Sequence, residues 1–213
     1  MSCGDISRPS HSSAAEGVSP STHWLVGMRS PIAVASMVQG MAWRPRSPDT
    51  LYEYLRGRWQ LTKSMDYTPG GGVAGEFVGV ADFEPLRCAD GGVRLSYLED
   101  GMATLGGGQS VSATKRLLWD LSTSPVRVHF DEARDRDPEA ILEGARFFHT
   151  IELPVEAEED PPPFEHWCTP DTYRGSLTFE SSDAFLMTWQ VQGPKKLGNI
   201  VGKYARSSPS ETS

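Results

Sequence analysis

The chain has 213 residues and a formal net charge of −8, from 28 acidic and 20 basic side chains. This acidic excess argues against binding to the phosphate backbone of nucleic acids, which requires a basic surface. No apolar run reaches the ~18 residues of a membrane-spanning helix, so we predict a soluble protein without a membrane span. The three cysteines are odd in number and widely spaced. We therefore predict no disulfide framework and a cytoplasmic location.

Residues 1–48 differ in composition from the rest of the chain. They are rich in serine, contain helix-breaking prolines and carry four arginines against two acidic residues. We interpret this leader as a disordered tail or as translated upstream sequence. The alternative is a transit peptide for the mitochondrion or another organelle. Residues 207–213 form a polar tail, so the folded domain is predicted to span 49–206.

The folded domain is predicted to begin with a short helix and to continue as strands. Ser47 and Thr50 supply N-cap chemistry, and Leu51, Tyr54 and Leu55 follow at helical spacing. From residue 56 onward, apolar and polar residues alternate between turn signals. The expected strands are 56–64, 73–83, 93–99, 111–121, 126–131, 145–153, 164–179, 183–192 and 199–206, with acidic loops at 132–142 and 156–163. This pattern predicts an all-β fold, a single antiparallel up-and-down barrel.

Motifs along these strands resemble a known family. They are Gly57-x-Trp59, Tyr97-x-Glu99-x-Gly101, Arg116-x-x-Trp119, Phe148-His149, His166-x-Cys168-x-x-Asp171-x-Tyr173-x-Gly175, Trp189-x-Val191-x-Gly193-Pro194-x-Lys196 and Tyr204-x-Arg206. In this order they resemble a functionally uncharacterised family of lipocalin-like, calycin-type barrels over residues 51–206. The chain departs from the family pattern at Leu117, where a tyrosine is expected, and at Leu197 and Gly198, where an aspartate and an aromatic residue are expected.

The resemblance implies structural roles for part of these motifs. In the calycin arrangement a tryptophan closes the barrel floor and an arginine of the last strand lies over its ring, which suits Trp59 and Arg206. The residues expected to be structural are Gly57, Trp59, Gly175, Gly193, Pro194 and Arg206. The family has no established activity, so the resemblance implies a fold and not a function.

Strand parity predicts a polar set inside the barrel. Tyr97 and Glu99 share a face with apolar neighbours, and His149 shares one with Phe147 and Ile151. The parity changes between Cys168 and Asp171, which we attribute to a bulge at Pro170. We expect a ligand pocket lined by Tyr97, Glu99, Arg116, Trp119, His149, His166, Cys168, Asp171, Tyr173 and Trp189.

Three chemical interpretations of this polar set stay open. Glu99 or Asp171 could pair with His149 or His166 for acid/base catalysis, with Cys168 as a nucleophile. His149, His166 and Cys168 could be three metal ligands, although no HExxH or CxxC pair supports them. The simplest interpretation is a hydrogen-bonded core network beside a buried thiol.

The prediction for function is a barrel that binds a small apolar or amphipathic molecule, with Trp59, Tyr97, Phe147 and Trp189 among its interior side chains. The alternatives are an enzyme that uses the same pocket, and a structural or interaction protein whose own side chains fill the barrel. No cofactor is predicted, and the expected partner is a small molecule and not a nucleic acid. The sequence names neither the ligand nor the oligomeric state.

Overall fold

The computed structural model describes residues 43–68, 74–156 and 159–206. Most of the expected leader (1–42) and the expected tail (207–213) lie outside these residues. None of the helices in the described ranges is long and apolar enough to cross a membrane.

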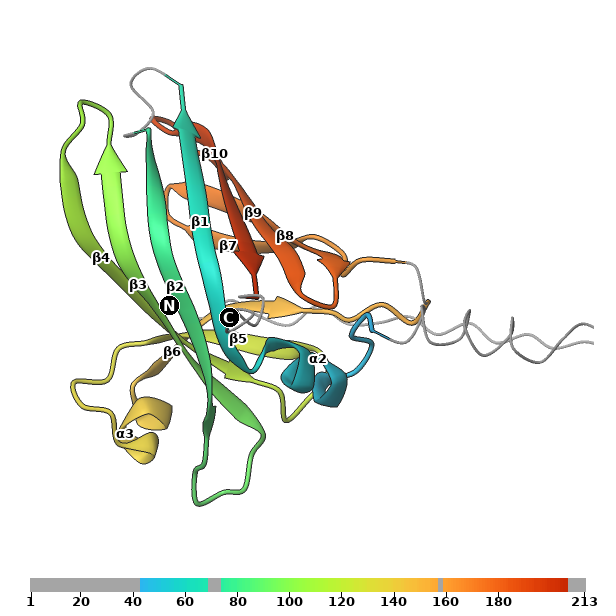
Figure 1. The fold of residues 1–213 in the computed structure, drawn as a ribbon. Coiled ribbons are helices and arrows are strands. Elements are labelled where there is room, and N and C mark those ends of the chain that lie inside the picture. Colours follow the sequence, from blue (N-terminus) through green and yellow to red (C-terminus); the bar gives the residue numbers. More distant parts are fainter. Residues whose placement is uncertain (1–42, 69–73, 157–158, 207–213) are drawn as a thin grey trace, which may run out of the picture.

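Ten antiparallel strands form one sheet that curls into a nearly closed barrel (Figure 1). Their order in the sheet is β6-β5-β4-β3-β2-β1-β10-β9-β8-β7. Strands that follow one another in the chain are therefore paired, except β6 and β7, which are the two ends of the sheet, and β1 pairs with β10 to join the two halves. This confirms the predicted single all-β antiparallel barrel with a short helix before its first strand. The elements are α2 (Pro48–Leu55), β1 (Gly57–Tyr67), β2 (Gly75–Leu86), β3 (Arg94–Leu105), β4 (Ser110–Asp120), β5 (Val126–Asp131), α3 (Pro138–Glu143), β6 (Ala145–Ile151), β7 (Phe164–Cys168), β8 (Asp171–Ser181), β9 (Ala184–Gln192) and β10 (Leu197–Ala205).

Helix α2 covers one end of the barrel. Ser47 caps it by accepting a hydrogen bond from the Thr50 backbone N–H, as its sequence predicts. The apolar side of α2 buries Leu51, Tyr54 and Leu55. The Tyr54 hydroxyl donates to carbonyls at the β8–β9 turn, at 2.8 and 3.0 Å. The helix therefore seals this end through apolar burial and through hydrogen bonds to a distant hairpin.

Trp59 and Arg206 make the contact that the calycin resemblance implies. The Arg206 guanidinium lies 4.1 Å from the centroid of the Trp59 ring and donates to the carbonyls of Tyr54 and Arg56, at 2.7 and 2.8 Å. Gly57 has φ +98°, and a Cβ there would lie 3.1 Å from the same guanidinium. Glycine at this position thus permits both the backbone corner and the close approach of Arg206.

Two expectations for the chain path are wrong. The stretch 164–179 is not one strand with a bulge at Pro170, because β7 and β8 form an antiparallel hairpin in which Cys168 pairs with Asp171. The acidic stretch 132–142, expected as a loop, contains the helix α3. Asp137 caps α3, because its side chain accepts hydrogen bonds from two backbone N–H groups. The acidic composition had suggested a loop, and it did not indicate this cap.

Phe147 lies outside the barrel, contrary to the sequence prediction. The pairing of β5 and β6 shifts register between Val128 and His129, so Phe148 is the extra residue on β6. Because of this shift Phe148 and His149 are both buried, whereas the Phe147 side chain is 53% exposed. Simple alternation therefore placed the wrong phenylalanine in the core.

The barrel is incompletely closed on one side, at the seam between β6 and β7. These end strands of the sheet are joined by no ladder in the described part of the chain. One hydrogen bond crosses the seam, 2.8 Å between His166 Nδ1 and the Phe148 carbonyl. Strand β5 pairs only with residues 117–120 of β4, so within the described ranges residues 110–116 of β4 have no strand on that side.

Candidate functional site

Two adjoining cavities occupy the barrel and share Lys115, Trp189 and Ile200 in their walls. The outer cavity has a volume of about 250 Å³ and the inner one about 80 Å³. The outer cavity, beside the seam, is lined by Lys115, Phe130, Phe148, His166, Cys168, Tyr173, Trp189 and Ile200. The inner cavity is lined by Lys63, Phe83, Tyr97, Lys115, Leu117, Trp119, Phe185, Met187, Trp189, Ile200, Gly202 and Tyr204.

A chain of polar side chains borders the inner cavity. Lys63 Nζ lies 2.5 Å from Glu99 Oε2, and the Tyr97 hydroxyl donates to the same oxygen at 2.8 Å. The Tyr97 and Tyr204 hydroxyls are 3.0 Å apart. Burial raises the pKa of both tyrosines, which keeps them protonated as donors at neutral pH. The Glu99 carboxylate is thus fully engaged by side chains of β1 and β3.

Lys115 extends from β4 into the space that both cavities share. Its Nζ lies 5.3 Å from the centroid of the Phe148 ring, within cation–π range. Among the described residues, no hydrogen bond or ion pair engages this ammonium. Burial lowers the pKa of Lys115 to about 8; the nearby charge of Lys63 acts in the same direction and that of Glu99 opposes it. Lys115 is therefore a cation that faces an aromatic cavity and is available to a ligand.

The β7–β8 hairpin supplies the polar side chains of the outer cavity. His166 and Tyr173 are direct partners across the two strands, with ring centroids 6.4 Å apart. The Phe148 carbonyl can only accept, so the hydrogen bond across the seam places a proton on His166 Nδ1. Cys168 borders the same cavity and is exposed. Of the residues expected in the pocket, the structure brings these three together here with Trp189.

His149 does not line either cavity. Its ring stacks on Phe164, with centroids 4.3 Å apart and planes 6° from parallel, and the side chain is 1% exposed. Burial lowers the pKa of His149 to about 3, so the ring is neutral at physiological pH. In this structure His149 acts as an aromatic core residue, and its expected role in ligand binding is not supported.

Arg116 and Asp171 also lie away from the cavities. Arg116 is on the outer face of β4, where its guanidinium donates to the Ala133 carbonyl at 2.9 Å. Three residues along a strand reverse the face, so the Arg116-x-x-Trp119 motif cannot place both side chains inside. The Asp171 carboxylate forms an ion pair with Lys196 Nζ at 3.0 Å. It also packs against Gly193, where any Cβ would clash with this carboxylate. Both residues have structural contacts that the pocket prediction did not foresee.

The catalytic and metal interpretations lack their expected geometry. Within the described ranges, no hydrogen bond or ion pair joins Glu99 or Asp171 to His149 or His166, because the two carboxylates are bound by lysines. No group of three or more His, Cys, Asp or Glu side chains in those ranges is arranged to hold a metal ion. His149, His166 and Cys168 are accordingly not brought together as a ligand set.

Lys63, Lys115 and Tyr204 are the polar lining residues that the predicted pocket lacked. The signal was present, because Lys63 has the parity of the buried Trp59 and Leu61, and Lys115 that of Leu117 and Trp119. Leu117, which replaces the tyrosine expected from the family pattern, lines the inner cavity and makes that part of its wall apolar.

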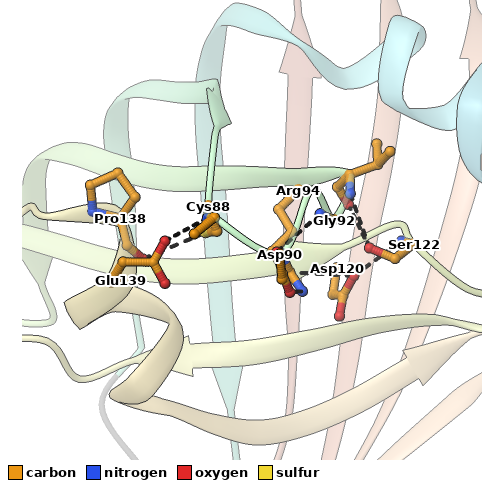
Figure 2. Close-up of polar contacts among 10 residues, drawn as sticks. Cys88, Asp90, Gly92, Arg94, Asp120, Ser122, Pro138 and Glu139 are labelled. Carbon is orange, nitrogen blue, oxygen red and sulfur yellow. Dashed lines mark hydrogen bonds and ion pairs between the residues drawn. The ribbon is translucent and has the colours of Figure 1, made fainter.

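A larger hollow of about 660 Å³ lies on the surface beside α2 and the β2–β3 connection. Figure 2 shows one of its charged residues, Arg94, close to Asp90 and Asp120. Arg94 donates to both Asp90 oxygens at 2.6 and 2.7 Å, and its Nε lies 3.8 Å from Asp120 Oδ1. Two carboxylates already neutralise this guanidinium, and the loop beside the hollow is held by these ion pairs. The hollow is therefore a weaker candidate for a ligand site than the barrel interior.

One known protein family matches the part of the chain that forms the barrel. Its model covers residues 55–206, which is most of the described chain. The chain belongs to the DUF6314 family, a family of unknown function. No curated protein matches this DUF6314 chain in sequence.

Solved structures similar to this DUF6314 protein are β-barrels. The S-type phycobiliprotein lyase CPES of Guillardia theta has 11% identity and a TM-score of 0.47, covering 79% of this chain and 96% of its own. A redesigned β-barrel, mFAP0, solved with bound DFHBI, has 13% identity and a TM-score of 0.35, covering 72% and 99%. At these identities the likeness concerns the fold alone.

Proposed function

We propose that this DUF6314 protein binds a small amphipathic molecule inside its barrel. The observation that carries the proposal is the pair of adjoining cavities, whose walls are largely aromatic and contain a few polar groups. Apolar walls with few convergent polar groups are the usual form of a ligand site. A barrel filled by its own side chains would leave no such space beside an unpaired lysine.

The seam is the proposed route of the ligand. The outer cavity is bordered by Phe148 and His166, the two residues whose hydrogen bond crosses the seam. Lys115 belongs to the part of β4 that pairs with β3 and, among the described residues, has no strand on its other side. A ligand would therefore reach the cavity from the side of the barrel, because helix α2 covers one end.

The location of the protein belongs to the same proposal. Cys88 and Cys168 are both free thiols, which suits the reducing cytoplasm predicted from the number of cysteines. The organelle alternative depends on residues 1–42, which lie outside the described residues.

Native mass spectrometry of the gently purified chain tests whether a small molecule is bound. A matched pair of variants then locates it. Ile200→Phe narrows both cavities, whereas Val78→Phe adds the same ring on the outer face, where Val78 is 61% exposed. We expect the bound molecule to be lost in Ile200→Phe and kept in Val78→Phe. A bound molecule that persists in Ile200→Phe with an unchanged melting temperature would contradict the proposed site.

A further inference from the structure

We infer that the barrel selects a small aromatic acid, with the carboxylate at Lys115 and the ring in the outer cavity against the wall that Phe148 and Trp189 form. This inference deepens the proposed function and rests on it. Four observations support it: the balance of charge in the cavities, the balance of hydrogen-bond donors, the aromatic walls and the size of the two spaces.

The charge balance of the two cavities leaves one positive charge over. Their linings contain two lysines, Lys63 and Lys115, and no aspartate or glutamate. The nearby carboxylate of Glu99 is 2.5 Å from Lys63 and therefore balances that lysine. A single ammonium, that of Lys115, stays without a counter-charge among the described residues. A ligand with one negative charge would supply this counter-charge. The charge balance therefore favours a carboxylate over a doubly charged phosphate.

The hydrogen-bond balance also points to a ligand that accepts. The Tyr97 hydroxyl gives its proton to Glu99, so the Tyr204 hydroxyl must donate to Tyr97. Trp119 lines the inner cavity and is 2% exposed, and its Nε1–H has no hydrogen-bond partner in the described part of the chain. A buried donor without an acceptor costs ~1–3 kcal/mol. The site therefore offers donors at Lys115 and Trp119 and needs acceptor oxygens.

The shape of the site limits the rest of the ligand. Phe148 and Trp189 are stacked, with centroids 5.2 Å apart and planes 21° from parallel, and they form one wall of the outer cavity with Tyr173. The outer volume of about 250 Å³ lies below the ~300 Å³ at which drug-sized sites begin. The inner volume of about 80 Å³ has room for a carboxylate or a water molecule and not for a ring. One or two fused rings with an attached acid would suit these spaces.

The test compares naphthoate with naphthamide, its neutral amide, by isothermal titration calorimetry on the full chain. At pH 7 we expect naphthoate to bind about tenfold more tightly, the factor that one charge-assisted hydrogen bond supplies. Lys115→Met removes the charge and keeps an unbranched apolar side chain, so the two compounds should then bind equally. Lys203→Met is the matched control, since Lys203 is an exposed lysine of β10. It should keep the preference for naphthoate.

Each outcome separates this inference from the proposed function. Equal binding of acid and amide to the unaltered protein, or a preference that survives in Lys115→Met, overturns the inference and leaves the ligand site standing. Failure of both compounds, together with a neutral molecule in native mass spectrometry, overturns it in the same way. Failure of both compounds with no co-purified molecule overturns the inference and the proposed function together. Melting temperatures of the variants exclude a folding defect, and Lys115→Gln repeats the charge removal with a different side chain.

Discussion

Glu99 and Lys115 lie directly opposite each other on β3 and β4, yet the carboxylate binds a different lysine. The ammonium it engages is that of Lys63, which reaches it from β1 across the barrel interior at 2.5 Å. Lys115 is thereby left facing Phe148 and the cavities. Because Glu99 pairs with Lys63 and not with Lys115, the barrel interior contains a structural ion pair and, separately, an ammonium that is available to a ligand.

This division predicts opposite effects on stability for two substitutions. Glu99→Gln should lower the free energy of unfolding by about 3 kcal/mol, because it leaves the Lys63 ammonium buried without its counter-charge. Lys115→Met should leave the stability unchanged or raise it, because no partner among the described residues is lost. Urea denaturation followed by far-UV circular dichroism measures both. A larger loss in Lys115→Met than in Glu99→Gln would reverse the assignment.

The contact between Arg206 and Trp59 should be a substantial source of stability. Arg206→Met removes a cation–π contact and two hydrogen bonds to backbone carbonyls, and we expect a loss of about 2 kcal/mol. Arg58→Met is the matched control, because the Arg58 side chain is 66% exposed and its pair with Asp82 lies on the surface. Thermal melts should show a clear decrease for the first variant and a negligible one for the second.

His149 should make the fold sensitive to acid. The pKa of His149 is lowered to about 3 by burial, whereas an unfolded chain has its histidines near ~6.5. Between these values the unfolded state binds the extra proton, so the free energy of unfolding falls as the pH decreases through this window. His149→Phe keeps an aromatic ring against Phe164 and should flatten this dependence. Denaturation midpoints measured from pH 7 to 4 that show the same slope in both proteins would disprove the assignment.

Lys115 should have its own signature at alkaline pH. The pKa of Lys115 is about 8 in the folded protein, lowered chiefly by burial, against ~10.4 in an unfolded chain. The unfolded state therefore binds more protons between these values, and stability should rise with pH across that window. The raised pKa values of Tyr97 and Tyr204 act in the opposite direction above pH ~10. The difference in unfolding free energy between the unaltered chain and Lys115→Met isolates the contribution of this lysine from that of the tyrosines.

The fold was predictable because its causes are local and repeated. Period-two alternation, turn residues and the cap of α2 each act within a few residues, and they agree with one another along the chain. The contact of Arg206 with Trp59 is long-range, and it was found through the resemblance to calycin barrels. Failures occurred where a single residue changed the register. The extra residue at Phe148 altered which side chains face inward, and the tight turn at Pro170 made a hairpin of what was expected as one bulged strand.

The site was harder to predict, because it depends on which polar groups find partners. Asp171 and His149 have the burial that the sequence indicated, yet Lys196 neutralises the first and Phe164 stacks on the second. Such pairings join residues of different elements, and strand parity does not predict them. Lys115 shows the converse, since its importance comes from a partner that is absent in the described residues.

The single hydrogen bond across the seam makes barrel closure and cavity occupancy depend on the same residues. Every other strand boundary would have to lose a backbone ladder to widen, whereas this one would lose the hydrogen bond between His166 and Phe148 and the stacking of His149 on Phe164. Phe148 also forms the cavity wall beside Lys115. Local opening at the seam should therefore require little free energy compared with global unfolding. A ligand bound in the cavity would then hold the two end strands of the sheet together. It would therefore reduce the motion of the whole barrel and not only that of the residues it contacts.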